Sequence, residues 1–117
     1  MKNFTWKKIG RIIWPQQFSW MKSHAMCPTP EILDNDKIRL YFSGRNKKNQ
    51  SIIGHADLIF KNFPDNFKIV YCKKPDLDIG KLGTFDDSGV TPTCLINYNK
   101  KKFLYYPLIF FLIKMKI

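Results

Sequence analysis

The feature that most constrains this chain is a series of short stretches in which apolar and polar residues alternate, each followed by a turn. Residues 37–44 (KIRLYFSG) place Ile38, Leu40 and Phe42 on one face and Arg39 and Tyr41 on the other. A period of two residues is typical of a half-buried β-strand. No helical period of useful length occurs in the sequence. The pattern therefore predicts an all-β chain.

Further strands are expected on both sides of this segment. Residues 30–33 form a short apolar segment, and the turn at 34–36 (DND) joins them to 37–44 as a hairpin. A polar loop at 45–50 (RNKKNQ) leads to a strand at 51–59, and a turn at 62–66 (NFPDN) leads to a strand at 67–72. Four short antiparallel strands in roughly 45 residues match one blade of a β-propeller.

A second unit then begins with the same layout, since residues 90–98 (VTPTCLINY) and 102–106 (KFLYY) repeat the first hairpin. We therefore divide the chain into a lead-in and the beginning of an incomplete propeller. The parts are a lead-in at 1–22, a first blade at 23–73, an acidic, glycine-rich loop at 74–89, the start of a second blade at 90–106 and an atypical tail at 107–117.

The positive charge of the chain does not by itself indicate a nucleic-acid partner. The net charge is +11, but 17 of the 20 basic residues are lysine. Arginine is the side chain favoured for bidentate contacts with phosphate and guanine. We therefore expect no nucleic-acid partner. The alternative is a small basic nucleic-acid binder that uses Trp6, Trp14, Trp20 and the lysines.

The cysteines and the N-terminus favour a cytoplasmic protein. Cys27, Cys72 and Cys94 form no CxxC pair, and an odd number cannot pair completely within one chain. We expect reduced thiols, no metal and no cofactor. The first 14 residues (MKNFTWKKIGRIIW) are interrupted by charge, so they lack the continuous apolar region of a secretory signal.

The apolar run at 103–113 (FLYYPLIFFLI) has eleven residues and contains Pro107. A spanning helix needs about 20 residues, so we expect no membrane span. The run ends in Lys-Met-Lys-Ile without a turn, as an out-of-frame extension would. We therefore expect a truncated or frameshifted product. The alternative is a genuine short chain whose tail packs as a strand against a partner, with self-association through exposed sheet edges.

Candidate chemistry is concentrated in the loop at 77–90 (LDIGKLGTFDDSGV). Three glycines let the backbone turn tightly or approach a ligand closely. Asp86, Asp87 and Ser88 then lead into a strand, which could place a carboxylate at the mouth of a propeller. The alternative is that both aspartates are solvated turn formers.

Two further residues are expected near the same rim. His24 lies beside small residues and prolines just before the first predicted strand, and Arg45 ends the strand at 37–44, where it could bind a hydroxyl or carboxylate. The alternatives are a packed or capped imidazole and a solvated loop charge. His55 lies in an apolar strand, and we expect a structural role for it.

Four segments occur together and in order: GRIIWP, SHAMCPTP, KIRLYFSGRNKKNQSIIGHADL and LGTFDDSGVTPT. Over roughly residues 10–106 the chain resembles the opening of a bacterial glycosidase-like family. This family is related to the five-bladed propeller hydrolases of glycoside hydrolase families 32, 43, 68 and 130, and it often accompanies surface-polysaccharide genes. The resemblance implies the first one to two blades of a five-bladed propeller, with a carbohydrate bound in its central funnel.

The related families use three acidic residues: a base or nucleophile near the start of blade one, an orienting acid at blade two and an acid in blade three. The resemblance implies the second role for Asp87 or for its neighbour Asp86, and it places Asp86, Ser88, His24 and Arg45 near the sugar. No acid precedes Glu31 in blade one, and blade three is absent.

The expected function is therefore a fragment of a protein that hydrolyses or transfers glycosidic bonds, without a complete active site. Five blades of about 40–50 residues each would need roughly 200–250 residues. The alternative function is a non-catalytic interaction module that completes a β-sheet with a partner chain.

Overall fold

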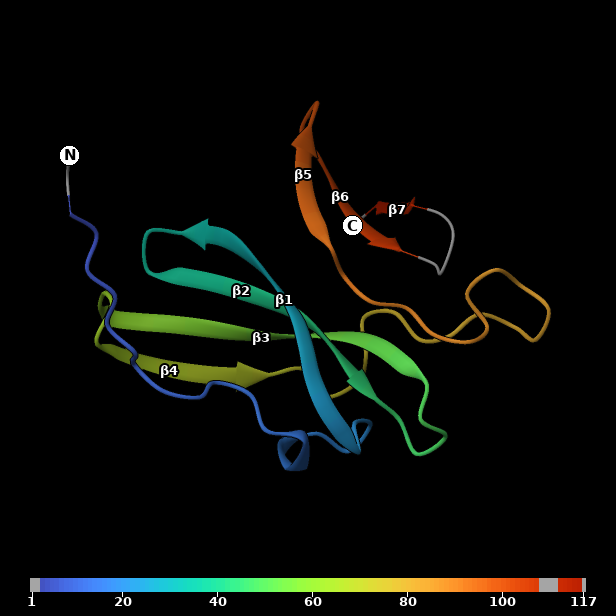
Figure 1. Ribbon diagram of the computed structural model, residues 1–117. Coiled ribbons are helices and arrows are strands. Elements are labelled where there is room, and N and C mark those ends of the chain that lie inside the picture. Colours follow the sequence, from blue (N-terminus) through green and yellow to red (C-terminus); the bar gives the residue numbers. More distant parts are fainter. Residues whose placement is uncertain (1–2, 108–111, 117) are drawn as a thin grey trace.

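The computed structural model describes residues 3–107 and 112–116 and arranges them as two antiparallel β-sheets (Figure 1). The first sheet has the order β1-β2-β3-β4 and the second the order β5-β6-β7. Their strands are β1 (Ser23–Asp34), β2 (Lys37–Arg45), β3 (Ser51–Asn62), β4 (Asn66–Tyr71), β5 (Cys94–Tyr98), β6 (Lys101–Pro107) and β7 (Leu112–Lys116). Among the described residues the only helix is the 3-10 turn η1 (Pro15–Gln17). The predicted all-β class is therefore confirmed.

The two central strands of the first sheet are buried on both faces. Their register is unbroken from the Lys37–Ile59 pair to the Arg45–Ser51 pair. Because side chains alternate along a strand, Tyr41 and its neighbour Phe42 point to opposite faces, and both are buried. Each face of the sheet must therefore be covered by another part of the chain.

The face that carries Phe42 is covered by the lead-in. Phe18 packs on Phe42 and Tyr71, with ring centroids 5.3 and 5.1 Å apart. The Tyr71 hydroxyl donates to the Ile12 carbonyl oxygen at 3.1 Å, which holds the lead-in along β4 (Figure 1). The buried residues of this core are Ile13, Phe18, Met21, Phe42 and Ala56.

The opposite face is covered by the second sheet. Tyr41 and Ile53 of the first sheet pack with Leu104 and Tyr106 of β6 and with Val90, which precedes β5. Leu104 and Ile53 are both 0% exposed. The two sheets therefore share one core, to which distant segments of the chain contribute.

Charged side chains are paired beside this second core. Lys102 of β6 contacts the buried carboxylate of Glu31, which also accepts a hydrogen bond from the Tyr41 hydroxyl at 3.4 Å. Arg39 donates from Nε and Nη2 to the two carboxylate oxygens of Asp57, at 2.7 and 3.0 Å. The Arg39 guanidinium holds the pKa of the Asp57 carboxyl below its usual value. These contacts add electrostatic links within the first sheet and between the two sheets.

The strands predicted at 37–44, 51–59 and 67–72 are confirmed as β2, β3 and β4. The first strand is much longer than the predicted segment at 30–33, because β1 begins at Ser23. Pro28 and Pro30 therefore lie inside a strand. This is possible because β1 is the edge strand of its sheet, where a missing backbone donor breaks no ladder on the open side.

The hairpin formed by β5 and β6 turns tightly at Asn99 and Lys100, whose φ angles are +49° and +58°. Positive φ at both central residues is typical of a two-residue hairpin turn. Its first strand begins at Cys94, four residues later than the predicted segment at 90–98.

Part of the predicted tail continues the second sheet, since β7 pairs antiparallel with β6. The rest of the tail, residues 108–111 and 117, lies outside the described residues. Within the described ranges, the structure contains no helix with the length and apolar character needed to cross a bilayer.

Candidate functional site

A row of backbone pairs brings the predicted site residues to one end of the first sheet. Ser23 of β1 pairs with Arg45 of β2, and Arg45 pairs with Ser51 of β3. Ser51 in turn forms a parallel bridge with Gly89, at the end of the acidic loop. Three segments therefore lie side by side at this end of the strands: the start of β1, the turn between β2 and β3, and the loop at 77–90.

The acidic loop can approach β3 this closely because Gly89 has no side chain. Its φ is +139°, and a Cβ atom at this position would lie 2.9 Å from the backbone nitrogen of Ser51. The next residue, Val90, donates its N–H to the Ser51 carbonyl oxygen at 2.8 Å and is buried in the second core. One glycine thus fixes where the loop carrying both aspartates joins the sheet.

Asp87 presents a partly exposed, ionised carboxylate in this loop. Oδ2 accepts the backbone N–H of Gly83 at 2.8 Å, and Oδ1 accepts the Ser88 hydroxyl at 2.8 Å. These hydrogen bonds, that of Gly83 foremost, lower the pKa of the Asp87 carboxyl. The Gln50 side chain also donates to the Asp87 carbonyl oxygen at 3.4 Å, which ties the loop to the β2–β3 turn. Asp87 is therefore suited to accept hydrogen bonds as a carboxylate and not to donate a proton.

Asp86 is turned toward the inside of the loop. Its Oδ1 lies 2.8 Å from the Thr84 hydroxyl, and its carbonyl oxygen accepts the N–H of Gly80 at 3.1 Å. A Cβ atom at Gly80 would lie 1.8 Å from Asp86 Oδ1, so a side chain at this position would displace the carboxylate from where it lies. The charge of Asp86 also adds to burial in raising the pKa of Tyr106. Asp86 thus shapes the loop, and both aspartates are only partly exposed.

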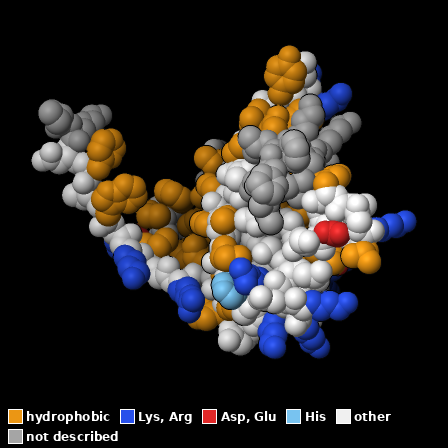
Figure 2. All heavy atoms as spheres, turned by 45° about the vertical axis from the view of Figure 1, so that its right-hand side comes forward, with side chains coloured by type: hydrophobic (Ala, Val, Ile, Leu, Met, Phe, Trp, Pro, Cys, Tyr) orange, Lys and Arg blue, Asp and Glu red, His pale blue; other side chains and the backbone are white. Residues whose placement is uncertain are grey.

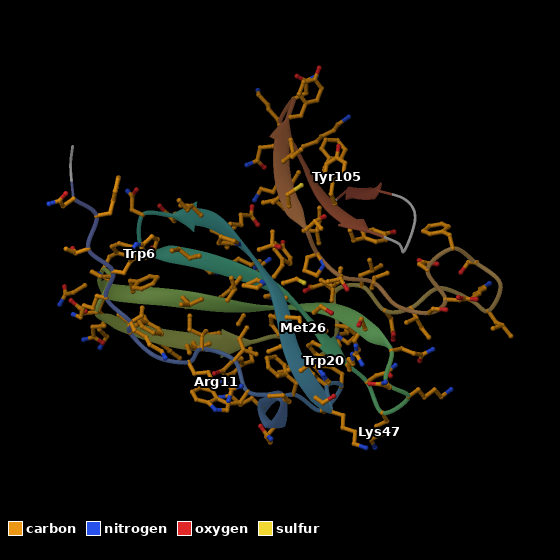
Figure 3. All side chains as sticks on the ribbon, viewed as in Figure 1. Trp6, Arg11, Trp20, Met26, Lys47 and Tyr105 are labelled. Carbon is orange, nitrogen blue, oxygen red and sulfur yellow. The ribbon has the colours of Figure 1, made fainter. Side chains whose placement is uncertain are left out.

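Arg45 lies where sequence reasoning predicts it, at the end of β2. Its Nη1 donates to Asn49 Oδ1 at 3.0 Å across the β2–β3 turn, whose tip carries Lys47 (Figure 3). Arg45 Nε is buried, and among the described residues it has no hydrogen-bond partner. A ligand from solvent cannot reach this buried atom, but the guanidinium has further N–H donors, and these could bind a hydroxyl or carboxylate oxygen of a ligand.

His24 lies inside β1 and not before it, which corrects the sequence prediction. It has a φ of +61°, in a part of β1 where the pairing with β2 is irregular between Ser23 and Met26. Its imidazole is exposed, and Nδ1 lies 2.9 Å from the Ser23 hydroxyl. Adjacent strands are about 4.8 Å apart, so the three steps from Ser23 to Gly89 span roughly 14 Å. His24 and Asp87 therefore share an edge of the sheet, but they do not form one compact cluster.

Basic side chains dominate the surface around this end of the molecule. Figure 2 turns this end toward the reader and shows lysine and arginine side chains along the lower rim, with few aspartate or glutamate side chains on this face. The partly exposed carboxylate of Asp87 is therefore a minority charge on a basic surface.

A shallow hollow of about 220 Å³ lies elsewhere, between the lead-in and β1. It is lined mainly by apolar side chains, and Arg11 and Met26 lie at its wall (Figure 3). None of the residues proposed for the acidic loop borders it. This hollow and the sheet edge that carries Asp87 are thus separate features.

Sequence reasoning missed the charged residues between the sheets. Glu31, Asp57 and Arg39 are strand residues whose partners become visible only once the strand register is known. Asp57 within the apolar segment SIIGHADLIF is a usable signal, because a charge buried in a strand is nearly always paired. Three side chains of metal-ligating types, His55, Cys72 and Asp76, also converge beside β3.

No protein-family model matches the chain, and no solved structure matches it. The chain is similar to two uncharacterized proteins of Mycobacterium tuberculosis, Rv1502 of strain H37Rv and MT1551 of strain CDC 1551. Each is 37% identical to it over 103 residues, which cover 86% of this chain and 33% of the relative. The chain therefore spans about one third of the length of the relatives that it matches.

Proposed function

We propose that this chain supplies the first blade and the beginning of the second blade of a five-bladed propeller that hydrolyses or transfers glycosidic bonds. The up-and-down order of β1 to β4 is that of a propeller blade, and the second sheet packs on one face of the first. The matched 103 residues are 33% of each relative, so the relatives are about 310 residues long. Five blades of about 40–50 residues fit within that length.

The observation that carries the proposal is the row of pairs from Ser23 through Arg45 and Ser51 to Gly89. Through these pairs, the three segments that carry the residues expected to face a sugar lie at the same end of the first sheet. Ligand-binding residues are commonly placed on loops that a rigid scaffold positions.

In this proposal Asp87 binds a sugar hydroxyl with its ionised carboxylate, and its charge tunes a carboxylic acid supplied by another blade. Ser88 and Arg45 add polar contacts on either side of it. His24, roughly 14 Å away along the row, contacts a different unit of an oligosaccharide. Cleavage needs a second carboxyl group at a defined separation, about 5–5.5 Å or 6.5–9.5 Å depending on mechanism, and the remaining blades supply it.

The proposal is tested in the longer relative Rv1502, with oligosaccharides and chromogenic glycosides as substrates. Replacing the residue that aligns with Asp87 by asparagine is expected to lower kcat/KM by about 100-fold or more. The matched control is the same replacement at the residue that aligns with Asp65. In this chain Asp65 lies in the β3–β4 turn, and its exposed carboxylate pairs with Lys7. Unchanged hydrolysis in the Asp87 variant, or no cleavage of any glycoside by Rv1502, would refute the proposal.

A second candidate function is a non-catalytic module that associates through exposed apolar side chains. Trp6 is 97% exposed and Phe4 is 87% exposed on the lead-in, and Ile32 is 79% exposed on the edge strand β1. Large apolar side chains at an open sheet edge favour association with another chain. A monomer at high concentration, measured by light scattering, would exclude self-association.

A further inference from the structure

Three side chains with different ligand atoms meet beside β3. His55 lies on β3, Cys72 directly follows β4, and Asp76 lies in the segment that leaves the first sheet. One ligand atom from each residue lies within 4.8 Å of the other two. His55 Nδ1 and Asp76 Oδ2 are 2.7 Å apart. The group combines nitrogen, sulfur and oxygen, and zinc accepts each of these atoms as a ligand.

Backbone contacts with β3 fix the positions of all three residues. The Cys72 N–H donates to the His55 carbonyl oxygen at 3.2 Å, and the His55 N–H donates to Cys72 Sγ at 3.3 Å. The Asp76 N–H donates to the Ile53 carbonyl oxygen at 2.8 Å, and Leu77 forms an antiparallel bridge with Ile53. One strand therefore positions both the end of β4 and the following segment, so the ligand atoms converge without an ion.

Burial gives the group a closed side and an open side. Cys72 and Trp20 both border Gly54 and both pack against the core that the lead-in covers. The side chains of His55 and Asp76 are 19% and 28% exposed. An ion can therefore arrive from solvent at the imidazole and carboxylate and reach the sulfur behind them.

The same surroundings argue against a nucleophilic role for the cysteine. Burial raises the pKa of the Cys72 thiol, and the nearby Asp76 carboxylate adds to this effect. A reactive cysteine needs the opposite shift, toward a stable thiolate. A divalent cation, by contrast, deprotonates a thiol that coordinates it and is neutralised by one thiolate and one carboxylate.

We propose that His55, Cys72 and Asp76 bind one zinc ion, with water as the fourth ligand. Zinc bonds to nitrogen and oxygen at about 2.0–2.2 Å and to sulfur at about 2.3 Å. Tetrahedral ligands are then about 3.4 Å apart, so His55 Nδ1 and Asp76 Oδ2 need to separate by less than about 1 Å. The ion takes the place of the hydrogen bond between these two atoms and links Asp76, which lies just before the acidic loop, to β3. This inference does not depend on the proposed carbohydrate function.

The test is a titration of the full 117-residue chain with Co²⁺, followed by displacement with Zn²⁺. A thiolate bound to Co²⁺ gives a charge-transfer band in the near ultraviolet, and we expect one ion per chain. Zinc affinity is then measured by competition with a chromophoric chelator. Cys72→Ser and Asp76→Asn are each expected to weaken zinc binding by about 100-fold or more, because loss of outer-shell partners alone costs about 10–100-fold.

The chain contains its own matched controls. Cys27 and Cys94 are exposed, and His24 is the only other histidine. Cys27→Ser, Cys94→Ser and His24→Gln are expected to keep the band and the affinity. Absence of the band in the unmodified chain, its persistence in Cys72→Ser, or its loss in Cys27→Ser or Cys94→Ser would overturn the proposal. If Cys72→Ser does not fold, Asp76→Asn decides, because it keeps the side-chain volume, and unchanged zinc affinity there refutes the site.

Discussion

Removal of the Leu104 side chain tests whether the second sheet packs on the first. Leu104 belongs to β6 and is 0% exposed, among Tyr41 and Ile53 of the first sheet and Val90 before β5. Leu104→Ala deletes three carbon atoms from this core. The surrounding residues are held in two hydrogen-bonded sheets, so they can fill the space only in part. The variant therefore loses the transfer free energy of the side chain and also leaves a cavity.

The expected loss is about 3 kcal/mol, toward the lower end of the range of about 2.7–5.0 kcal/mol measured for buried leucines. Unfolding entropy is about 2.1 cal/mol/K per residue, or roughly 0.25 kcal/mol/K for a chain of this length. The free-energy loss then corresponds to a decrease in Tm of about 12 °C.

Thermal unfolding followed by circular dichroism, together with urea unfolding, measures this effect. The matched control is Leu82→Ala, since Leu82 is 98% exposed in the acidic loop and its truncation is expected to change stability by less than about 0.5 kcal/mol. A loss below about 1 kcal/mol for Leu104→Ala would mean that β6 does not pack on the first sheet, and the shared core would be wrong.

Two further predictions concern the first sheet and its contact with the acidic loop. Asp57→Asn is expected to lower the free energy of unfolding by about 1–2 kcal/mol at pH 7, since it removes a bidentate pair with Arg39 that is only partly exposed. Folding lowers the pKa of Asp57, so its carboxylate stabilises the folded chain at pH values above the unfolded pKa of about 3.9. This stabilisation is lost as the pH falls through the folded pKa. Urea unfolding should therefore show that the difference in stability between the wild type and Asp57→Asn becomes smaller in acid. Gly89→Ala is expected to destabilise the chain by about 1–3 kcal/mol, because its φ is +139° and the new Cβ would meet Ser51. Gly10→Ala has a similar φ and no atom within 4 Å, so it should cost less, and equal losses in thermal unfolding would contradict the close approach.

Much of the first sheet could be predicted from the sequence because its inner strands are amphipathic or apolar and end in recognisable turns. β2 and β3 follow this rule closely. The start of β1 could not be predicted in the same way, since Pro28 and Pro30 normally argue against a strand. They are accommodated because β1 lies at the edge of the sheet, a property of the topology and not of the local sequence.

The site was predictable only in its loops. The glycines and aspartates of the acidic loop stand out locally, but their distance from His24 follows from the strand order. His55, Cys72 and Asp76 have no motif spacing, and they converge only because β3 pairs with two segments at once. Contacts across strands depend on register, which alternating patterns alone do not fix.

We propose above that the end of the first sheet beside Asp87 forms part of a sugar site. The most direct measurement is glycoside cleavage by a chimera in which residues 10–106 of this chain replace the aligned third of Rv1502. If the proposal holds, the folded chimera cleaves the glycosides that Rv1502 cleaves. Asp87→Asn in the chimera then lowers kcat/KM by about 100-fold or more, and Asp65→Asn leaves it unchanged. A folded chimera that is equally active with and without the Asp87 carboxylate would contradict it.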